Sequence, residues 1–540
     1  MTSQKMSLYW VAFFLFFSFG LKSQSTLFDV KLEPISVTGL SGIQSYAFAK
    51  YDNKLLIIGG RLDGLHQRQP FASFDELGNN KKIYILDLDT KMATSYNISN
   101  LGMPYSEQFA STNIQFYQED NFLYLVGGYA FSNTEDGHIT FPYLSVVDVP
   151  TLINALENGE DTSSALYSLK DEKMAVTGGR LEKIGEKFYL VGGQRFDGAY
   201  NPMGPDHGPG FFQEYTNEVR IFEVSLTESG VEVNYNVPFH DEMHLHRRDY
   251  NLLPFMDDSS KSLMAFSGVF QPTVDLPWLY PVRVNEDAYL PIEEFNQYFN
   301  HYHSANLTIY DESNNENYFI FFGGIAQFYP EGDQIVQDNN VPFVKTITQI
   351  NLDNDGQMKE VALSAQMPDY LGASSEFIPA DAVKYGTEDH IINFDSIGDE
   401  YTSIGYIFGG IRSSADNIFF INTGSESTAN PVLYEVKVKR GISGINPNVL
   451  VDKVLDFQIY PNPTDDRIRM VVNVKDKSPL EILITNNNGQ KLHSRVINKA
   501  DLELGKNFLD LGQLALPDGV YYISINQNNR TRKQKLIISN

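Results

Sequence analysis

The sequence predicts an all-β protein, with a large body of six repeated four-stranded units followed by a small separate β domain. The first observation is a run of apolar residues ending in paired glycine, such as Leu55 to Gly60, that returns along the chain. The second is an aromatic content of 13%, since Phe and Tyr favour strands. The third is a charged content of only 20%, which argues against disorder. The copies of the run end at Gly60, Gly128, Gly193, Gly268, Gly324 and Gly410.

Each copy of the run is the second strand of a unit, and the glycines end that strand. In the second unit, the fourth strand lies beyond an acidic insertion at 157–161. In the fourth unit, where Ser267 replaces the first glycine, the sequence assigns no clear fourth strand. The units begin and end near residues 46–98, 112–149, 180–237, 251–285, 306–364 and 377–438.

The repeated plan resembles the kelch-type β-propeller over residues 27–440. The match rests on the glycine pair and on the apolar run before it. The tryptophan usual in the fourth strand of a kelch repeat is missing, since the chain has only Trp10 and Trp278. The resemblance implies a six-bladed ring. A ring buries both faces of each sheet and leaves few exposed strand edges.

The start of the body predicts how such a ring would close. Residues 27–32 alternate apolar and polar side chains, which indicates a strand outside the six units. If residues 417–421 belong to a loop, the last unit lacks a fourth strand, because a linker follows 433–438 directly. We therefore predict that the N-terminal strand completes the last blade.

The first residues have the pattern of an N-terminal targeting segment. Lys5 precedes an apolar run from Met6 to Gly20, and the small residue Ser23 follows. This pattern predicts a signal peptide over 1–23. The alternative is a membrane anchor, but the run is shorter than the ~20 apolar residues that span a bilayer. No other stretch is apolar enough to predict a transmembrane segment.

The C-terminal end carries a second set of motifs in a fixed order. They are Tyr460-Pro461-Asn462-Pro463, the turn at Asn488-Gly489, the strand Asp518-Gly519-Val520-Tyr521-Tyr522, and the basic close Lys533 to Lys535. This tail, residues 455–540, resembles the type A sorting domain of the type IX secretion system of Bacteroidetes. The alternative is a generic immunoglobulin-like adhesion module.

The resemblance of the tail implies a Gram-negative host and the type IX secretion machinery as a partner. It further implies export across the outer membrane, removal of the tail, and release or attachment at the cell surface. The body is then expected over 24–445 and a linker over 446–454.

Composition excludes several function classes. The net charge of −27 would repel nucleic acid phosphates and anionic lipids, so nucleic acid is not an expected partner. The absence of cysteine excludes disulfides, thiolate nucleophiles and zinc–thiolate sites. No His-Glu-x-x-His, phosphate-binding glycine loop or Gly-x-Ser-x-Gly motif is present. We therefore predict no catalytic residue, metal or cofactor.

A ligand site is predicted where the long loops gather. In a four-stranded blade, the connections from strand two to three and from strand four to the next blade share one face. Arginines and histidines on that face would form a positively charged surface around the channel opening, suited to binding an acidic sugar or acidic peptide. The candidates are Arg61, Tyr129, Gln194, Arg195, Gln327 and Arg412 after the glycines, and His246, Arg248, His301 and His303 before first strands.

Other interpretations of these residues stay open. Each arginine could instead pair with its own loop, Arg61 with Asp63 and Arg195 with Asp197. The spacings His244-x-His246 and His301-x-His303 suit metal ligands, but no carboxylate partner is identifiable. Residues 353–356 are typical of a hairpin turn rather than a calcium loop. The loop 200–212 is either a binding loop or a structural one.

The predicted function is that of a secreted or surface-attached propeller that binds an acidic glycan or a protein, without chemistry of its own. One alternative is a carbohydrate-active enzyme of the epimerase or lyase type on the same scaffold. Another is a structural surface component.

Overall fold

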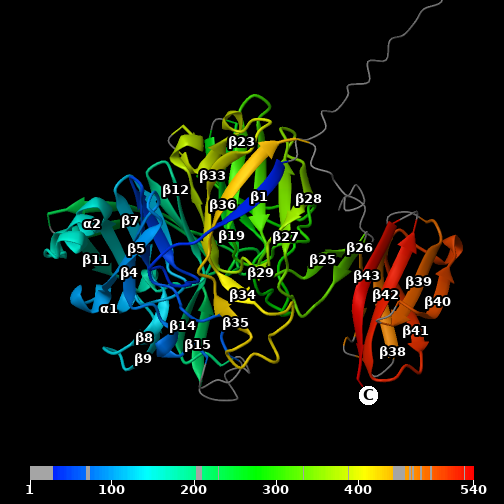
Figure 1. Ribbon diagram of the computed structural model, residues 1–540. Coiled ribbons are helices and arrows are strands. Elements are labelled where there is room, and N and C mark those ends of the chain that lie inside the picture. Colours follow the sequence, from blue (N-terminus) through cyan, green and yellow to red (C-terminus); the bar gives the residue numbers. More distant parts are fainter. Residues whose placement is uncertain are drawn as a thin grey trace, which may run out of the picture.

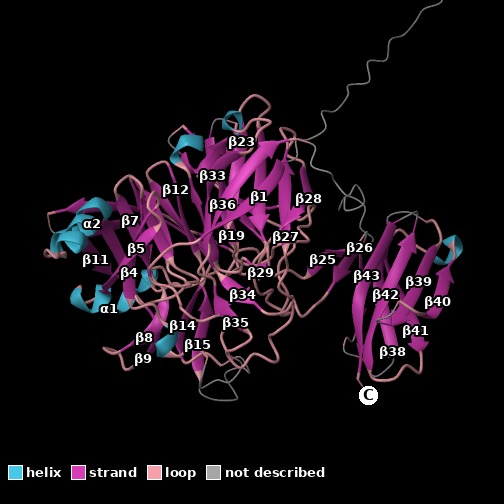
Figure 2. Ribbon diagram, in the orientation of Figure 1, coloured by secondary structure: helices cyan, strands magenta, loops and turns pink. Residues whose placement is uncertain are grey.

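The structure is a computed structural model, and strands predominate in it (Figures 1 and 2). The signal peptide predicted over 1–23 and the linker predicted over 446–454 lie outside the described residues. Among the residues described, no helix has the length and apolar character needed to cross a membrane. The structure describes residues 28–441 except 68–72, 202–209, 229, 259, 333 and 387, and residues 456–539 except 461, 463, 465–466, 475–476, 487–488 and 528–529.

Each of the six predicted units forms an antiparallel sheet around four strands in meander order. The first three sheets consist of β2 (Ala47–Tyr51), β3 (Lys54–Ile58), β4 (Lys82–Asp87) and β5 (Met92–Asn97); β6 (Gln115–Glu119), β7 (Phe122–Val126), β10 (Tyr143–Asp148) and β11 (Leu166–Lys170); and β12 (Arg180–Ile184), β13 (Lys187–Val191), β16 (Glu218–Thr227) and β17 (Gly230–Tyr235), with β18 (Phe239–His240) beside β16.

The remaining sheets follow the same plan. They consist of β19 (Asn251–Asp257), β20 (Ser260–Phe266), β21 (Val282–Val284) and β22 (Tyr289–Pro291); β23 (Asn306–Asp311), β24 (Glu316–Phe322), β27 (Thr346–Leu352) and β28 (Met358–Gln366), extended by β32 (Glu388–Asn393) and β31 (Lys384–Tyr385); and β30 (Ser375–Pro379), β33 (Thr402–Gly409), β36 (Leu433–Arg440) and β1 (Phe28–Ile35).

Smaller elements decorate the loops. The acidic insertion of the second unit begins within helix α2, which Asp148 caps through its side chain. The added elements are helices α1 (Tyr105–Gln108) and α2 (Val149–Asn158), strands β8 (Tyr129–Ser132), β9 (Gly137–Thr140), β14 (Gln194–Gly198), β15 (Phe211–Tyr215), β25 (Phe328–Glu331), β26 (Gln334–Gln337), β29 (Tyr370–Leu371), β34 (Ile411–Ser413) and β35 (Ser427–Ala429), and 3-10 turns at Glu76–Gly78, Ile98–Asn100, Ser163–Ala165, Glu172–Met174, Asp381–Val383 and Phe394–Ser396.

The N-terminal strand β1 supplies the outer strand of the last sheet, as predicted. It pairs antiparallel with β36 along its whole length, from Phe28 opposite Arg440 to Ile35 opposite Leu433. Residues 417–421 form no strand, so β36 is the third strand of this sheet. In Figure 1 the two strands lie side by side, although they come from opposite ends of the body.

The apolar runs are buried on both faces, which explains why they are continuous rather than alternating. In β3, Leu56 belongs to the core shared with the second sheet, and Leu55 to the core shared with the sixth. Within the described residues, a buried cluster joins each sheet to the next, and one joins the last to the first. The clusters contain Leu56 and Leu123, Val126 and Leu190, Tyr189 and Leu263, Phe266 and Phe319, Ile320 and Val436, and Phe408 and Leu55.

Hydrogen bonds, from backbone to backbone in all but one case, also connect the units at their inner ends, just before the first strand of each. We call this set the inner circle. Between the second and third units, the Thr177 hydroxyl donates to the Asn113 carbonyl at 3.4 Å. The other links run from the N–H of Ser45 to Ser374 O (3.0 Å), Asn113 to Ser45 O (3.1 Å), Asp249 to Gly178 O (2.7 Å), His303 to Asp249 O (2.9 Å) and Ser374 to His303 O (2.8 Å).

The inner circle imposes a left-handed backbone. Ser45, Asn113, Asp249 and Ser374 have φ between 50° and 60°, and Gly178 has φ of 67°. At Gly178 a Cβ would lie 2.9 Å from Asp249 Oδ1, so the circle leaves no room there for a side chain.

Residues 456–539 form a two-layered β structure around their own apolar core. One layer is β37–β38–β41, and the other is β43–β42–β39–β40. The strands are β37 (Asp456–Tyr460), β38 (Arg467–Val474), β39 (Leu480–Asn486), β40 (Lys491–Ile497), β41 (Gly505–Gln513), β42 (Gly519–Gln527) and β43 (Arg530–Ile538), with a 3-10 turn at Lys499–Asp501.

The role of β1 gives a first testable prediction. Phe28 is fully buried and packs edge-on against Tyr318, with ring centroids 5.2 Å apart. We expect Phe28→Ala to cost about 3–5 kcal/mol of stability and to lower the thermal unfolding midpoint by several degrees. Lys31→Ala, on the exposed face of the same strand, is the matched control and should change little. Equal midpoints for the two variants, measured by calorimetry, would show that β1 does not contribute to the core.

Candidate ligand-binding site

A cavity lies where the inner ends of the six units meet, on the side of the long loops. Its volume is about 120 Å³, and every unit contributes to its wall. A cavity lined by all six units places side chains from distant parts of the sequence within reach of a single ligand. The lining residues are Gln44, Ser45, Arg61, Gly64, Leu65, His66, Phe74, Thr112, Asn113, Tyr129, Thr177, Gly178, Gln194, Phe196, Tyr200, Gln213, Arg248, Asp249, Tyr302, Ser374 and Ile411.

One repeated backbone contact brings four of the predicted residues to this cavity. In the first four units, the residue directly after the strand-ending glycine forms a β-bridge with a residue just before the first strand. Seven of the eight residues in these bridges line the cavity, and Val269 is the exception. The bridges join Gln44 and Arg61, Thr112 and Tyr129, Thr177 and Gln194, and Arg248 and Val269.

The predicted arginines Arg195 and Arg412 lie one residue further along and outside the cavity lining. Successive side chains of a strand point to opposite sides, so a shift of one residue turns them away. Arg195 pairs with Asp197 at 2.7 Å and Glu172 at 2.8 Å. Arg412 is 52% exposed and pairs with Asp369.

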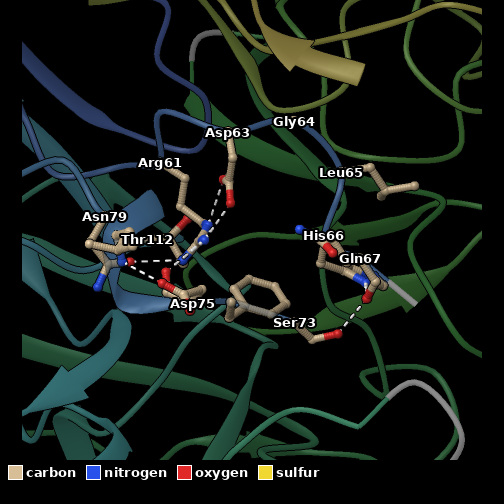
Figure 3. Close-up of polar contacts among 12 residues, drawn as sticks. Arg61, Asp63, Gly64, Leu65, His66, Gln67, Ser73, Asp75, Asn79 and Thr112 are labelled. Carbon is tan, nitrogen blue, oxygen red and sulfur yellow. Dashed lines mark hydrogen bonds and ion pairs between the residues drawn. The ribbon is translucent and has the colours of Figure 1, made fainter. Parts of the chain in front are cut away.

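Arg61 lines the cavity but is also a structural residue of its loop. Its side chain is only 2% exposed. Its guanidinium donates to Asp63 Oδ1 at 2.8 Å, to Asn79 Oδ1 at 2.8 Å and to the Asp75 carbonyl at 3.0 Å (Figure 3). These contacts match the interpretation in which each arginine holds its own loop. Because these contacts use most of its hydrogen-bond donors, the Arg61 guanidinium has little capacity left to bind a ligand.

Arg248 differs because it belongs to a polar group at the cavity wall. Its Nε donates to the Tyr215 hydroxyl at 2.9 Å, and its Nη1 donates to Asp249 Oδ2 at 2.5 Å. Asp249 also accepts a hydrogen bond from Asn113 Nδ2 at 3.0 Å. Burial, and then the negative charge of Asp249, raise the pKa of Tyr302 well above its usual value. The wall therefore holds a fixed cation, a fixed anion and a neutral phenol.

The predicted histidines do not gather at the cavity. His301 is fully buried, and its Nε2–H donates to the Gln297 carbonyl at 3.0 Å while Nδ1 accepts from the Gln327 backbone N–H at 3.0 Å. These two contacts assign the neutral tautomer, and Gln327 itself is also buried. Burial lowers the pKa of His301 to about 4.

The other two histidines occupy different places. His246 stacks on Tyr215, with ring centroids 3.7 Å apart, and contacts Asn217 Oδ1 through Nδ1 at 2.9 Å. His303 lies outside the cavity lining, and its Nε2 is 2.9 Å from Glu376 Oε1. Burial, and then the charge of Arg180, lower the pKa of His303. Among the residues described, no cluster of three His, Asp or Glu side chains could hold a metal ion.

Apart from Tyr129, the aromatic side chains of the wall were not predicted from the sequence. His66 stacks on Phe74 at 5.5 Å between ring centroids, and Tyr200 meets both rings edge-on at 4.8 and 5.5 Å. Phe74 also contacts Tyr129, whose hydroxyl donates to the Gly198 carbonyl at 2.8 Å. The one available signal was the aromatic loop beginning at Tyr200. The positions of His66 and Phe74 depend on how the first long loop folds back over the axis.

Two comparisons with known proteins gave matches. Residues 458–539 match the family described as the secretion system C-terminal sorting domain. This domain marks the protein as one exported by the type IX secretion system, either attached to the cell surface or released. No protein of curated function matches the sequence.

Among solved structures, one titled "Structure of YjhT" aligns with a TM-score of 0.41 and 11% identity, over 73% of this chain and 100% of that chain. A similarity at this level leaves the type of repeat and the function to be argued from the residues themselves.

The buried His301 predicts a pH dependence of stability. Its pKa is about 4 in the folded protein and about 6.5 when unfolded, so only the unfolded chain takes up this proton between those values. The contribution of the neutral His301 to the free energy of unfolding is therefore present above pH 6.5. It is lost as the pH falls toward 4, by up to about 1.4 kcal/mol per pH unit. Unfolding free energies of the wild type and of His301→Gln should converge as the pH falls through this window. Parallel curves would contradict the buried neutral ring.

Proposed function

We propose that the body is a closed six-bladed β-propeller of the kelch type that binds the acidic end of a glycan in the axial cavity. Three observations support the ring. Each unit forms a four-stranded sheet, buried clusters join neighbouring sheets, and the inner circle links the sixth unit to the first through Ser45 and Ser374. The single observation that carries the binding proposal is the cavity itself, which all six units build.

The cavity wall suits a sugar ring. A sugar presents a face of C–H groups and a rim of hydroxyl groups. The faces of the Phe74 and Tyr200 rings, which meet edge-on at an interplanar angle of 83°, offer apolar surface for the first. The amides of Gln194 and Gln213 can donate to and accept from hydroxyl groups, and they are already fixed by a mutual hydrogen bond of 2.6 Å.

Arg248 is the residue proposed to select an acidic sugar. A guanidinium has five N–H donors, and the contacts with Tyr215 and Asp249 use two of them. A ligand carboxylate in the cavity could accept hydrogen bonds from the remaining N–H groups of Arg248, in the strong, charge-assisted geometry that arginine favours. Asp249 keeps the cation in place and offsets its charge when no ligand is bound, so the cavity need not be strongly basic.

Binding to a glycan array, followed by calorimetry on the leading sugars, tests this function. We expect Tyr200→Ala to weaken binding of any sugar at least tenfold, because the ring surface is lost. Arg248→Lys should weaken acidic sugars selectively, since lysine lacks the planar fork. Arg412→Ala, which removes an exposed arginine outside the cavity, is the control and should leave affinity unchanged.

The outcomes separate the alternatives. Binding that survives Tyr200→Ala would place the ligand elsewhere on the protein, and no binding to any sugar would overturn the proposal. Release of an altered sugar from the wild type would instead indicate a carbohydrate-active enzyme on this scaffold.

A further inference from the structure

The body and the C-terminal domain share one sheet. The strands β25 and β26 of the fifth unit extend away from the body toward β43, as Figure 1 shows. β26 pairs parallel with β43, with Val336 opposite Lys533 and Gln337 opposite Gln534. The four-stranded layer of the tail is thus enlarged by two strands that belong to the body.

A buried arginine anchors this contact. Arg532 of the tail is only 1% exposed, although arginine is rarely buried without partners. Its guanidinium lies 4.6 Å from the ring centroid of Phe328 and 5.3 Å from that of Tyr298, both in the body. Its Nη2 donates to Gln337 Oε1 at 3.2 Å. Two aromatic faces and an amide oxygen of the body thus contact the guanidinium where it is withdrawn from solvent.

Charges on either side of this anchor are complementary. Lys533 Nζ lies 3.1 Å from Glu331 Oε2, and Lys535 Nζ lies 3.0 Å from Asp338 Oδ2. The Asp338 side chain is only 6% exposed, so solvent screens its ion pair poorly. The basic end of the tail therefore faces an acidic surface of the body.

The contact also covers a strand edge. The far half of β43 is covered within the tail, because Thr464 N donates to Ile537 O at 3.0 Å and Ser539 N donates to Thr464 O at 2.9 Å. β26 occupies the near half, around Lys533 and Gln534. An open edge of this kind invites pairing with other chains, and strand addition satisfies it.

We propose that β25, β26 and Tyr298 form a docking site of the body for the last strand of its own sorting domain. The site recognises an extended basic strand by main-chain pairing, by the aromatic cradle around Arg532 and by the acids Glu331 and Asp338. It holds the tail against the body and keeps the near edge of β43 covered. Secretion machinery that engages this edge must first displace β26, and removal of the tail leaves the cradle open.

Disulfide capture in the full chain tests the docking, and the absence of native cysteine makes the result unambiguous. Gln337→Cys combined with Gln534→Cys places one thiol on each paired strand. We expect rapid formation of an intramolecular disulfide under mild oxidation, seen as a loss of two mass units in the monomer. The control pair, Gln337→Cys with Lys491→Cys, puts the second thiol on β40 at the opposite edge of the sheet and should stay reduced.

Hydrogen exchange tests the role of the arginine independently. Arg532→Met should raise amide exchange in β26 and in the near half of β43 severalfold, while β38 and β41 stay protected. Arg467→Met removes an exposed arginine of the same tail, and it should leave β26 unchanged. The proposal would be overturned if both cysteine pairs were captured equally or if neither were captured. It would also be overturned if amide exchange in β26 were unchanged by Arg532→Met.

Discussion

The packing of the body depends on the inner circle of hydrogen bonds, because this circle joins consecutive sheets and also joins the sixth sheet to the first. Each N–H in the circle is satisfied by the unit before it, so no unit can shift without breaking the contact of its neighbour. The left-handed conformation at Ser45, Asn113 and Asp249 is the cost of aiming these groups at each other. The cavity wall includes six residues of this circle, Ser45, Asn113, Thr177, Gly178, Asp249 and Ser374.

Much of the fold could be predicted from local patterns. The apolar runs are buried on both faces, so they stand out in the sequence, and the glycines after them mark strand ends. The pairing of β1 with β36 followed from counting strands. The strand β22 could not be assigned, because Tyr289, Leu290 and Pro291 are too short a run to show a period.

The cavity was predicted less well than the fold, since its lining depends on the register of the strands. Gln194 lines it and Arg195 does not, although they are neighbours. The burial of His301 rests on backbone groups of residues 297 and 327 that no sequence pattern reveals.

One type of loop serves two purposes in this protein. The connection from the second to the third strand carries Arg61 in the first unit and Gln194 in the third, and there it lines the axial cavity. In the fifth unit the same connection forms β25 and β26 and contacts the tail. Because the sheets and the inner circle carry the stability of the body, such loops can differ between units without loss of the core.

Amide hydrogen exchange at Ser45 is the most direct test of the ring. Its N–H bonds the carbonyl of Ser374, and this is the link of the inner circle between the sixth unit and the first. In a closed ring, the Ser45 amide should exchange as slowly as those of Asn113 and Ser374, because the circle opens only when the body unfolds. Exchange at the rate of an exposed amide at Ser45, with the other two protected, would show that the ring is open at this point and would contradict the account.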